Sequence, residues 1–236
     1  MSIQGKVAVI TGAGGNLGST VTKRFLQEGA QVALTYRDEG QLADFLTQLP
    51  PGANPLAIPC DVSADTDVQQ MMEEVHNRLG GPHVLLNLVG GWAGGKTVAE
   101  TEEADWDRMM TLNLKTAFLC AKHALAYMIP QDYGRIVSVS SKAALDLPAK
   151  SAAYAVSKAG VLSLAKCLAQ EVKGTGVAAM AILPSVIDTP PNRAAMPKAD
   201  FTKWVAPEQI AEVLVYLAGE AGAALNGALL PVFGGV

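Results

Sequence analysis

The chain has 236 residues, of which half are apolar and 17% are charged, and its formal net charge is −4. This length suits one large α/β domain or two small ones, and the lack of a basic block in the sequence argues against a nucleic-acid partner. The three cysteines are odd in number and widely spaced. They predict neither a disulfide framework nor a zinc site, and we expect no other metal centre.

The first ten residues carry no signal-peptide pattern, and no apolar run approaches the roughly 18 residues of a membrane span. Together with reduced cysteines, these features predict a cytoplasmic protein without a membrane partner. The small charged fraction leaves little charge to solvate the whole surface. We therefore also expect a homo-oligomer, either a dimer or a tetramer.

The first predicted unit is a strand, a glycine-rich turn and a helix. Residues 6–10 (KVAVI) are typical of a buried parallel strand, residues 11–18 read TGAGGNLG, and residues 19–28 show helical apolar spacing. In this context the glycines let the backbone approach a pyrophosphate, and the helix N-terminus supplies amide groups. An ordinary glycine turn is the alternative. The cofactor contacts expected here are Gly12, Gly14, Gly15, Asn16, Leu17 and Gly18.

The second predicted strand, residues 31–36, ends at Tyr36 and is followed by Arg37. An acidic residue commonly holds the adenosine ribose of a nicotinamide cofactor at this point, about 20 residues after the glycines. An arginine suits a 2′-phosphate instead, so the sequence favours NADP(H) over NAD(H). Asp38 and Glu39 are counter-evidence, since either carboxylate would suit a free ribose. Arg37 would equally suit a solvated turn.

Helices and strands alternate through the middle of the chain, with predicted helices at residues 40–49 and 68–79 and predicted strands at residues 56–60 and 84–89. Asp61, followed by Val62, comes directly after the third strand. Its carboxylate would hydrogen-bond an adenine or cap the next helix.

Asn87 lies inside the fourth predicted strand. An unpaired buried amide costs about 1–3 kcal/mol, so we interpret Asn87 as a tether between strands. The loop that follows, residues 90–95 (GGWAGG), places Trp92 at the carboxyl end of a strand, where α/β sheets bind ligands. Trp92 would stack on a flat substrate or serve as a hydrophobic plug.

Residues 105–128 predict one long helix with Asn113, a poor helix former, in its middle. The remaining predicted elements are strands at residues 134–140, 177–183 and 229–232 and helices at residues 152–172 and 207–218. This alternation predicts a single doubly wound α/β domain over residues 1–236, a Rossmann fold with a parallel sheet of about seven strands. The proline-rich stretch at residues 184–205 is predicted to be a lid loop on the substrate side.

Tyr154 and Lys158 lie four residues apart on a predicted helix and therefore share one face. A free phenol titrates near pH ~10, and a neighbouring ammonium group favours the phenolate and lowers that pKa. Such a pair acts as a general acid/base when it lies in a cleft. A solvated helix face is the alternative interpretation of this spacing.

The chain resembles the short-chain dehydrogenase/reductase family over nearly its whole length. Residues 11–18 match the family's Thr-Gly-x-x-x-Gly-x-Gly pattern, with Asn16 in place of the middle glycine, and asparagine tolerates a left-handed φ. Residues 87–90 (NLVG) match its Asn-Asn-Ala-Gly motif in part. The family's catalytic tetrad is matched by Asn113, Ser141, Tyr154 and Lys158.

This resemblance implies hydride transfer between a nicotinamide and the carbonyl or conjugated imine of a small-molecule substrate. It implies Tyr154 as the general acid/base, Lys158 as the group that lowers its pKa and binds the nicotinamide ribose, Ser141 as a hydrogen-bond donor to the substrate, and Asn113 as the holder of a water. The further cofactor contacts that it implies are Asn87, Gly90, Pro184, Ile187 and Thr189.

Members of the family commonly form tetramers through the helix that holds the tyrosine and the helix corresponding to residues 207–218. Two sets of apolar residues would suit such contacts or would equally suit packing on the sheet. They are Val161, Leu164, Leu168, Ile210, Leu214 and Leu217.

The loops on the substrate side also resemble those of the dihydropteridine reductases, a branch of the family, at residues 90–95, 142–146 and 183–204. This likeness adds Trp92, Ser141 and Asn192 as substrate contacts. Two features depart from that branch, namely the presence of Ser141 and of Arg37 where an aspartate is normal. The sequence thus predicts an NAD(P)H-dependent oxidoreductase. Quinonoid dihydropteridine reductase, 3-oxoacyl thioester reductase and an NADP(H)-sensing protein without turnover are the alternatives.

Overall fold

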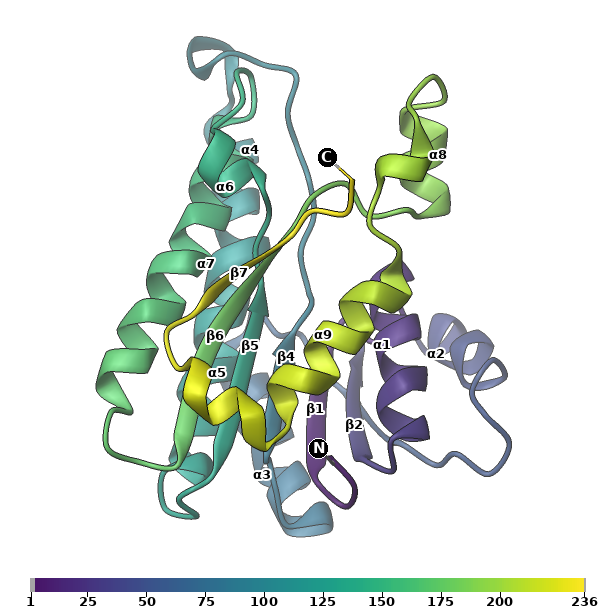
Figure 1. The fold of residues 1–236 in the computed structure, drawn as a ribbon, viewed down its shortest axis with the longest axis vertical. Helices are drawn as coiled ribbons and strands as arrows, with labels where there is room; N and C mark the ends of the chain where they lie inside the picture. The colour runs from purple at the N-terminus through teal and green to yellow at the C-terminus, as the bar shows by residue number, and fades with distance from the viewer. Residues whose placement is uncertain (1–2, 236) are drawn as a thin grey trace.

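The computed structural model describes residues 3–235, and its central feature is a parallel sheet of seven strands in the order β3-β2-β1-β4-β5-β6-β7 (Figure 1). The strands are β1 (Val7–Thr11), β2 (Gln31–Tyr36), β3 (Leu56–Pro59), β4 (Val84–Asn87), β5 (Gly134–Val139), β6 (Val177–Pro184) and β7 (Leu229–Val232). The strand order reverses between β1 and β4. In doubly wound sheets this reversal opens a crevice beyond the carboxyl ends of the strands.

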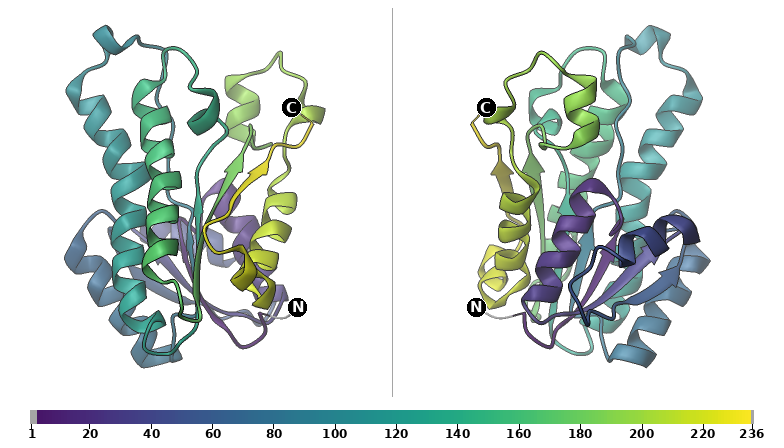
Figure 2. Two further views of the ribbon diagram at one scale, coloured as in Figure 1. Left: turned by 60° about the vertical axis from the view of Figure 1, so that its left-hand side comes forward. Right: turned by 90° about the vertical axis from the view of Figure 1, so that its right-hand side faces the viewer.

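Helices cover both faces of the sheet, with α3, α5 and α7 on one face and α1, α2 and α9 on the other (Figure 2). The helices are α1 (Asn16–Gln27), α2 (Glu39–Leu46), α3 (Asp65–Leu79), α4 (Glu103–Met110), α5 (Thr116–Met128), α6 (Ala143–Asp146), α7 (Ala152–Glu171), α8 (Pro190–Ala195) and α9 (Pro207–Ala218). This arrangement confirms the predicted doubly wound α/β fold.

The central strand β1 shows why a strand covered on both faces reads as a continuous apolar run. Its side chains alternate between the two faces of the sheet. Val7 and Val9 join the core beneath α3 and α5, whereas Ala8 and Ile10 join the core beneath α1 and α9. Because both faces are covered by helices, no position in the strand is free to be polar until Thr11 at its end.

Two segments differ from the sequence-based prediction. The predicted helix at residues 105–128 is interrupted by a π-helical turn at Thr111–Lys115, which contains Asn113. The predicted lid at residues 184–205 is not a structureless loop, because it contains α8 and a short 3₁₀ turn at Phe201–Lys203. A single β-bridge between Ile187 and Val205 closes its base.

Helix α7 is the one helix among residues 3–235 that is long and apolar enough to cross a membrane by length and composition. It is not an uninterrupted apolar run, because Ser157, Lys158 and Lys166 lie within it. Half of the apolar stretch is buried inside the protein, which is the behaviour of a core helix in a globular domain.

Five of the six apolar residues considered above for subunit contacts are buried within the chain, and Leu164 is partly buried against the core. The five buried residues are Val161 and Leu168 on α7 and all three named residues on α9.

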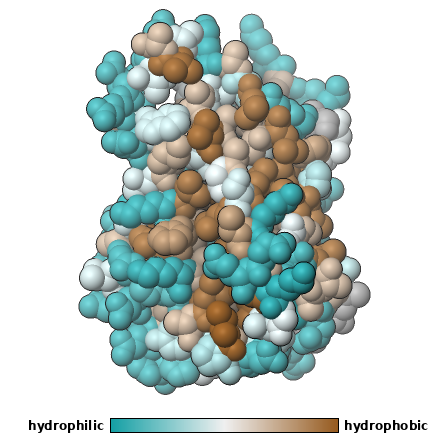
Figure 3. Space-filling model, turned by 90° about the vertical axis from the view of Figure 1, so that its left-hand side faces the viewer, coloured by the Kyte–Doolittle hydropathy of each residue, from teal (hydrophilic) through white to brown (hydrophobic). Residues whose placement is uncertain are grey.

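Other large apolar side chains point outward from α4, α5 and α7, namely Trp106, Phe118 and Val156. Figure 3 shows a band of apolar surface along this face of the molecule.

Candidate active site

A cleft of about 840 Å³ lies over the carboxyl ends of β1, β2 and β4. Its walls come from the glycine turn after β1, the residues after β2, β3 and β4, helix α2, and the segment from the end of α4 to the start of α5. The predicted cofactor contacts that line it are Gly12, Gly14, Gly15, Arg37, Asp61, Val62 and Gly90. Segments far apart in the sequence thus form one elongated groove at the switch point of the sheet.

The glycine turn is held by close backbone packing. Gly12 has a left-handed φ of +70°, and a Cβ atom on Gly18 would lie only 2.0 Å from the carbonyl oxygen of Gly12. No side chain caps the N-terminus of α1. The turn therefore presents bare backbone and free helix amides to the cleft.

Asn16 is the first residue of α1, and it is not among the non-glycine residues with positive φ. The left-handed φ that asparagine tolerates is therefore not used at this position. A right-handed residue suffices at this position, because the strained conformation falls on Gly12. Leu17 packs partly against the core under α1 and does not line the cleft.

Three charged residues near the ends of β2 and β3 differ in their hydrogen-bond partners. Arg37 is exposed and lines the cleft without a hydrogen bond to any residue in 3–235. Asp38 accepts a hydrogen bond from the backbone N–H of Gln41 at 2.7 Å and caps α2. Asp61 accepts from both the backbone N–H and the hydroxyl of Ser63, and these bonds, with a smaller contribution from Arg37, lower its pKa.

Asp61 thus stabilises the turn from Asp61 to Ser63, while the N-terminus of α3 has no side-chain cap. The alternative that assigned Asp61 as the cap of that helix is wrong.

Asn87 forms the inter-strand tether expected from its sequence position. Its amide donates to the hydroxyl of Ser138 on β5 at 3.1 Å, and its Oδ1 is buried without a hydrogen-bond partner among the described residues. A second tether was not foreseen. The hydroxyl of Thr11 donates to the carbonyl of Leu86 and accepts from the backbone N–H of Leu88 at 3.2 Å. Thr11 and Asn87 together fix β4 between its neighbours at the mouth of the cleft.

Tyr154 and Lys158 lie one turn apart on α7, and Ser141 comes from the loop after β5. Burial raises the pKa of the Tyr154 phenol, and a hydrogen bond between the Ser141 and Tyr154 hydroxyls acts in the opposite direction because it stabilises the phenolate. Burial also lowers the pKa of Lys158 to about 8, and its ammonium group donates to the carbonyl oxygen of Val139 at 2.9 Å.

The net direction for Tyr154 is opposite to the expectation from Tyr-x-x-x-Lys spacing. In the chain by itself, removal of the phenol from water outweighs stabilisation of the phenolate by its neighbours. Lys158 is not among the groups that shift the phenol's pKa.

Asn113 is held at the π-helical turn between α4 and α5 and is almost fully buried. Its side chain bonds to both backbone groups of Gly91, in the loop after β4, and to the hydroxyl of Ser157 on α7. Both amide protons are used by these contacts. A water held by this side chain would therefore have to use the second lone pair of its oxygen.

Gly90 lies where this amide meets Lys158. A Cβ atom at Gly90 would lie 2.9 Å from Asn113 Oδ1 and 2.9 Å from Lys158 Nζ. Since Gly90 also lines the cleft, the cleft adjoins Asn113 and Lys158, two of the four residues that the sequence singled out for catalysis.

The segment after β6 carries the other predicted contacts. Pro184 ends β6, Ile187 lies in the bridge to Val205, and Thr189 is a buried residue at the N-terminus of α8. Asn192 donates its amide to the carbonyl of Ile187 at 2.8 Å. The predicted substrate contact Asn192 is therefore occupied in holding α8 to the strand end.

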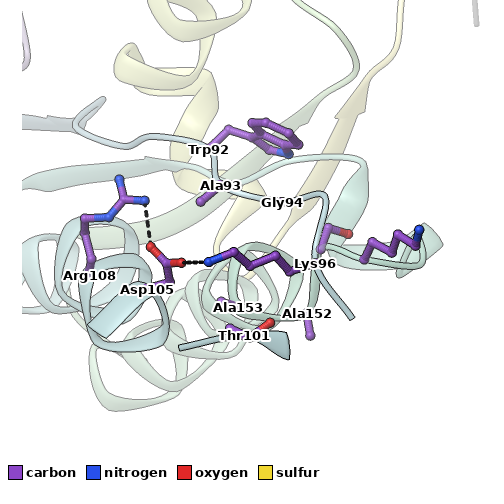
Figure 4. Close-up of a pocket in the computed structure, with 11 residues that line it drawn as sticks. Trp92, Ala93, Gly94, Lys96, Thr101, Asp105, Arg108, Ala152 and Ala153 are labelled. Atoms are coloured by element: carbon purple, nitrogen blue, oxygen red, sulfur yellow. Dashed lines mark hydrogen bonds and ion pairs between the residues drawn. The ribbon is translucent and has the colours of Figure 1, made fainter. Parts of the chain in front are cut away.

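Trp92 is 67% exposed, so the interpretation of this residue as a hydrophobic plug is wrong. Its indole packs over Gly94 of its own loop, and the backbone N–H of Gly95 donates to the carbonyl of Lys150 at 2.7 Å. Beneath the loop, a pocket of about 200 Å³ is bordered by an ion-pair chain of Lys96, Asp105 and Arg108 (Figure 4). An exposed aromatic ring at this rim is available to a flat ligand.

Known proteins resemble this chain over its whole length. The family model described as short chain dehydrogenase matches residues 6–200. The 3-oxoacyl-[acyl-carrier-protein] reductase FabG of Thermotoga maritima is 31% identical, with 100% of this chain and 99% of that protein covered. The meso-2,3-butanediol dehydrogenase of Serratia marcescens is 32% identical, with 100% of this chain and 96% of that protein covered.

Solved structures share the fold. The crystal structure of gox2181 superposes with a TM-score of 0.91 at 26% identity, covering 98% of this chain and 95% of the other. Levodione reductase has the same fold, with a TM-score of 0.91 at 24% identity, covering 98% of this chain and 97% of the other.

The match of the family model, the full-length relatives and the seven-stranded fold agree. The chain belongs to the short-chain dehydrogenase/reductase family of oxidoreductases.

Proposed function

We propose that the chain catalyses NAD(P)H-dependent hydride transfer to a carbonyl or conjugated imine, with Tyr154 as the general acid/base. One observation carries the proposal. A glycine-lined cleft of about 840 Å³ includes Gly90, whose backbone lies against Lys158, and Lys158 shares a helix face with Tyr154, whose pKa the neighbouring Ser141 hydroxyl acts to lower. The position and lining of this cleft suit a dinucleotide, and the helix face that carries Lys158 and Tyr154 adjoins it at Gly90.

The residues of the cleft fit a dinucleotide. The turn of Gly12, Gly14 and Gly15 leaves no side chain between the backbone and a bound pyrophosphate, and the uncapped N-terminus of α1 favours its negative charge. Asp61 and Val62 line the cleft and would border a bound adenine, whereas Pro184, Ile187 and Thr189 stay proposed contacts of the segment after β6. When bound, a reduced nicotinamide supplies the hydride.

The raised pKa of Tyr154 suits the reductive direction, because the phenol stays protonated at neutral pH and has a proton to give. Ser141 holds the phenol in position through its hydroxyl and would also donate to the substrate oxygen. Lys158 has a pKa of about 8 and is mainly protonated at neutral pH, so it supplies hydrogen-bond donors for ribose hydroxyls.

The preference for NADP(H) over NAD(H) is part of the proposal. Arg37 lines the cleft with no hydrogen-bond partner in residues 3–235, so its planar guanidinium group is free for a 2′-phosphate. Asp38, the main counter-evidence, uses one carboxylate oxygen to cap α2. A committed carboxylate is a poorer ligand for a ribose 2′-hydroxyl than a free one.

Two substrate classes follow from separate observations. The exposed indole of Trp92 at the smaller pocket favours a flat substrate, as in a quinonoid dihydropteridine reductase, a likeness that rests on loop residues. The relative from Thermotoga maritima, named as a 3-oxoacyl-[acyl-carrier-protein] reductase, favours a 3-oxoacyl thioester. An NADP(H)-sensing protein without turnover is the weakest candidate, because all four tetrad residues are present.

A spectrophotometric assay tests the proposal. The full-length protein is offered NADPH or NADH with an aliphatic diketone, a quinonoid dihydropterin or a 3-oxoacyl thioester in separate cuvettes. Oxidation of NADPH by at least one substrate is expected, with a lower KM for NADPH than for NADH. Binding of the cofactor without oxidation by any substrate would support the sensing alternative instead.

We expect a cytoplasmic homo-oligomer, without nucleic-acid or membrane partners. The outward apolar side chains Trp106, Phe118 and Val156, on α4, α5 and α7, support a contact between copies. Light scattering coupled to size exclusion distinguishes a dimer from a tetramer.

A further inference from the structure

A chain of buried hydrogen bonds links the loop after β4 to the backbone of Tyr154. Asn113 Nδ2 donates one proton to the carbonyl of Gly91 at 3.0 Å and the other to the hydroxyl of Ser157 at 3.0 Å. Asn113 Oδ1 accepts the backbone N–H of Gly91 at 2.9 Å. Ser157 in turn donates to the carbonyl oxygen of Tyr154 at 2.8 Å.

The direction of the last bond is fixed by chemistry. Ser157 is 0% exposed, so its hydroxyl has no solvent partner. The nitrogen of the Asn113 amide can only donate, so the Ser157 hydroxyl oxygen accepts from it. The single proton of the Ser157 hydroxyl is then donated to the carbonyl oxygen of Tyr154. Consecutive bonds of this kind polarise and strengthen one another in a buried site.

A serine bonded to the carbonyl three residues earlier is a common local feature of helices. Here the bond is more than local, because the donation from Asn113 ties α7 to two other elements. These are the π-helical turn that holds Asn113 and the loop that begins at Gly90 and carries Trp92.

The groups joined by these hydrogen bonds are closely packed. A Cβ atom at Gly90 would lie 2.9 Å from both Asn113 Oδ1 and Lys158 Nζ, so the loop, the amide and the lysine are packed against one another. Densely packed groups pass a displacement on to their neighbours. A shift of the loop at Gly91 therefore reaches Tyr154 through Asn113 and Ser157.

We propose that Ser157 is a positioning residue, which holds the backbone of Tyr154 in register with the loop at residues 90–95. Ser157 is fully buried and lines neither the cleft nor the smaller pocket, so it acts through Asn113 and Tyr154. Through Ser157, the loop that carries Trp92 and the proton donor Tyr154 keep a fixed position relative to each other. The catalytic consequence rests on the proposed function, whereas the mechanical coupling does not.

Hydrogen exchange tests the coupling without any assay of activity. In Ser157→Ala, peptides covering residues 88–96 and 152–158 are expected to exchange roughly fivefold or more faster than in the wild type, because the bonds that order them are weakened. Thr175→Ala is the matched control. Thr175 also donates to a carbonyl three residues earlier and accepts one backbone N–H, but it lies beyond the other end of α7. Its removal is expected to leave exchange in residues 88–96 unchanged.

Steady-state kinetics test the consequence for catalysis. Ser157→Ala is expected to lower kcat by about tenfold or more with a nearly unchanged KM, because a displaced proton donor impairs the reaction more than binding. Ser157→Cys keeps the size of the side chain with weaker hydrogen bonds, so it is expected to recover part of kcat, and it carries the test if the alanine variant does not fold.

Unchanged exchange at residues 88–96 in both Ser157 variants would overturn the proposal. So would a fall in kcat that Thr175→Ala reproduces in full. If the wild-type chain oxidises no cofactor with any substrate, the proposed function fails, and the exchange experiment still decides whether the loop and α7 are coupled.

Discussion

The glycine turn after β1 and the buried corner formed by Asn113, Ser157 and Lys158 between α4 and α7 present different chemical groups. The turn offers backbone, since Gly12, Gly14 and Gly15 line the cleft and no side chain caps α1. The corner offers side chains, since Asn113, Ser157 and Lys158 are each buried and each makes specific hydrogen bonds. A backbone site depends on the absence of atoms, whereas a side-chain site depends on several elements meeting correctly.

This difference predicts different sensitivities. The turn should lose stability and cofactor binding when a small group is added. The corner should lose its function when a polar group is removed or loses its proton. Substitutions in each region, and a change of pH, can therefore sharpen the comparison or break it.

The largest effect is expected for Gly18→Ala. The added Cβ atom would lie 2.0 Å from the carbonyl oxygen of Gly12, so the turn must move. Overpacking of this kind costs about 1–3 kcal/mol of unfolding free energy, and the moved amides should no longer bind a dinucleotide tightly. Urea unfolding and cofactor titration measure both effects.

Gly14→Ala is the matched control in the same turn, because its Cβ atom would meet nothing nearer than Phe45 at 4.0 Å. Its unfolding free energy should stay within about 0.5 kcal/mol of the wild type. Equal destabilisation by both variants would contradict the account of the turn.

A smaller effect is expected for Arg37→Gln. Loss of a charged hydrogen-bonding group costs about 1.5–3 kcal/mol, so the KM for NADPH should rise roughly tenfold to a hundredfold while that for NADH changes little. Asp38→Asn keeps a side-chain oxygen to cap α2 and should leave both KM values nearly unchanged. A rise in the KM for NADH alone in Asp38→Asn would instead assign the ribose to Asp38.

The smallest effect concerns pH. Burial lowers the pKa of Lys158 to about 8, so its ammonium group loses a proton as the pH rises through that value. We expect kcat/KM for reduction to be constant below about pH 7 and to fall by about tenfold per unit above about pH 8. A profile that stays flat to pH 9.5 would show that the charge of Lys158 is not needed.

The same shift predicts a change in stability. Because the folded-state pKa of Lys158 lies below its unfolded value, the unfolded chain binds a proton that the folded chain lacks between about pH 8 and pH 10.5. Over that window the contribution of Lys158 to the free energy of unfolding should become more favourable as the pH rises. Urea unfolding at fixed ionic strength measures it.

The sequence was sufficient for the elements that depend on local pattern. Val7–Thr11, Gln31–Tyr36 and Pro207–Ala218 follow from apolar spacing and from glycine or proline at their ends. The glycine spacing also indicated the cleft. The left-handed residue in the turn is Gly12 rather than Asn16, and sequence spacing does not identify which position is strained.

The rest depended on contacts between distant residues. The clamp of Asn113 on Gly91 joins residues 22 positions apart, and its bond to Ser157 joins residues 44 apart. The direction of the Tyr154 pKa depended on burial, which the Tyr-x-x-x-Lys spacing does not encode. The only signal for Ser157 was a hydroxyl in an otherwise alanine-rich turn of a core helix.

The central claim is that the Tyr154 phenol donates the proton in hydride transfer. Comparison of Tyr154→Phe with the wild type in NADPH oxidation, together with NADPH binding measured by fluorescence titration, tests it most directly. Loss of a positioned general acid should lower kcat by about 10²–10⁴-fold while the Kd for NADPH changes little, since the cleft is unaltered. Turnover near that of the wild type with unchanged cofactor binding would remove Tyr154 from the mechanism.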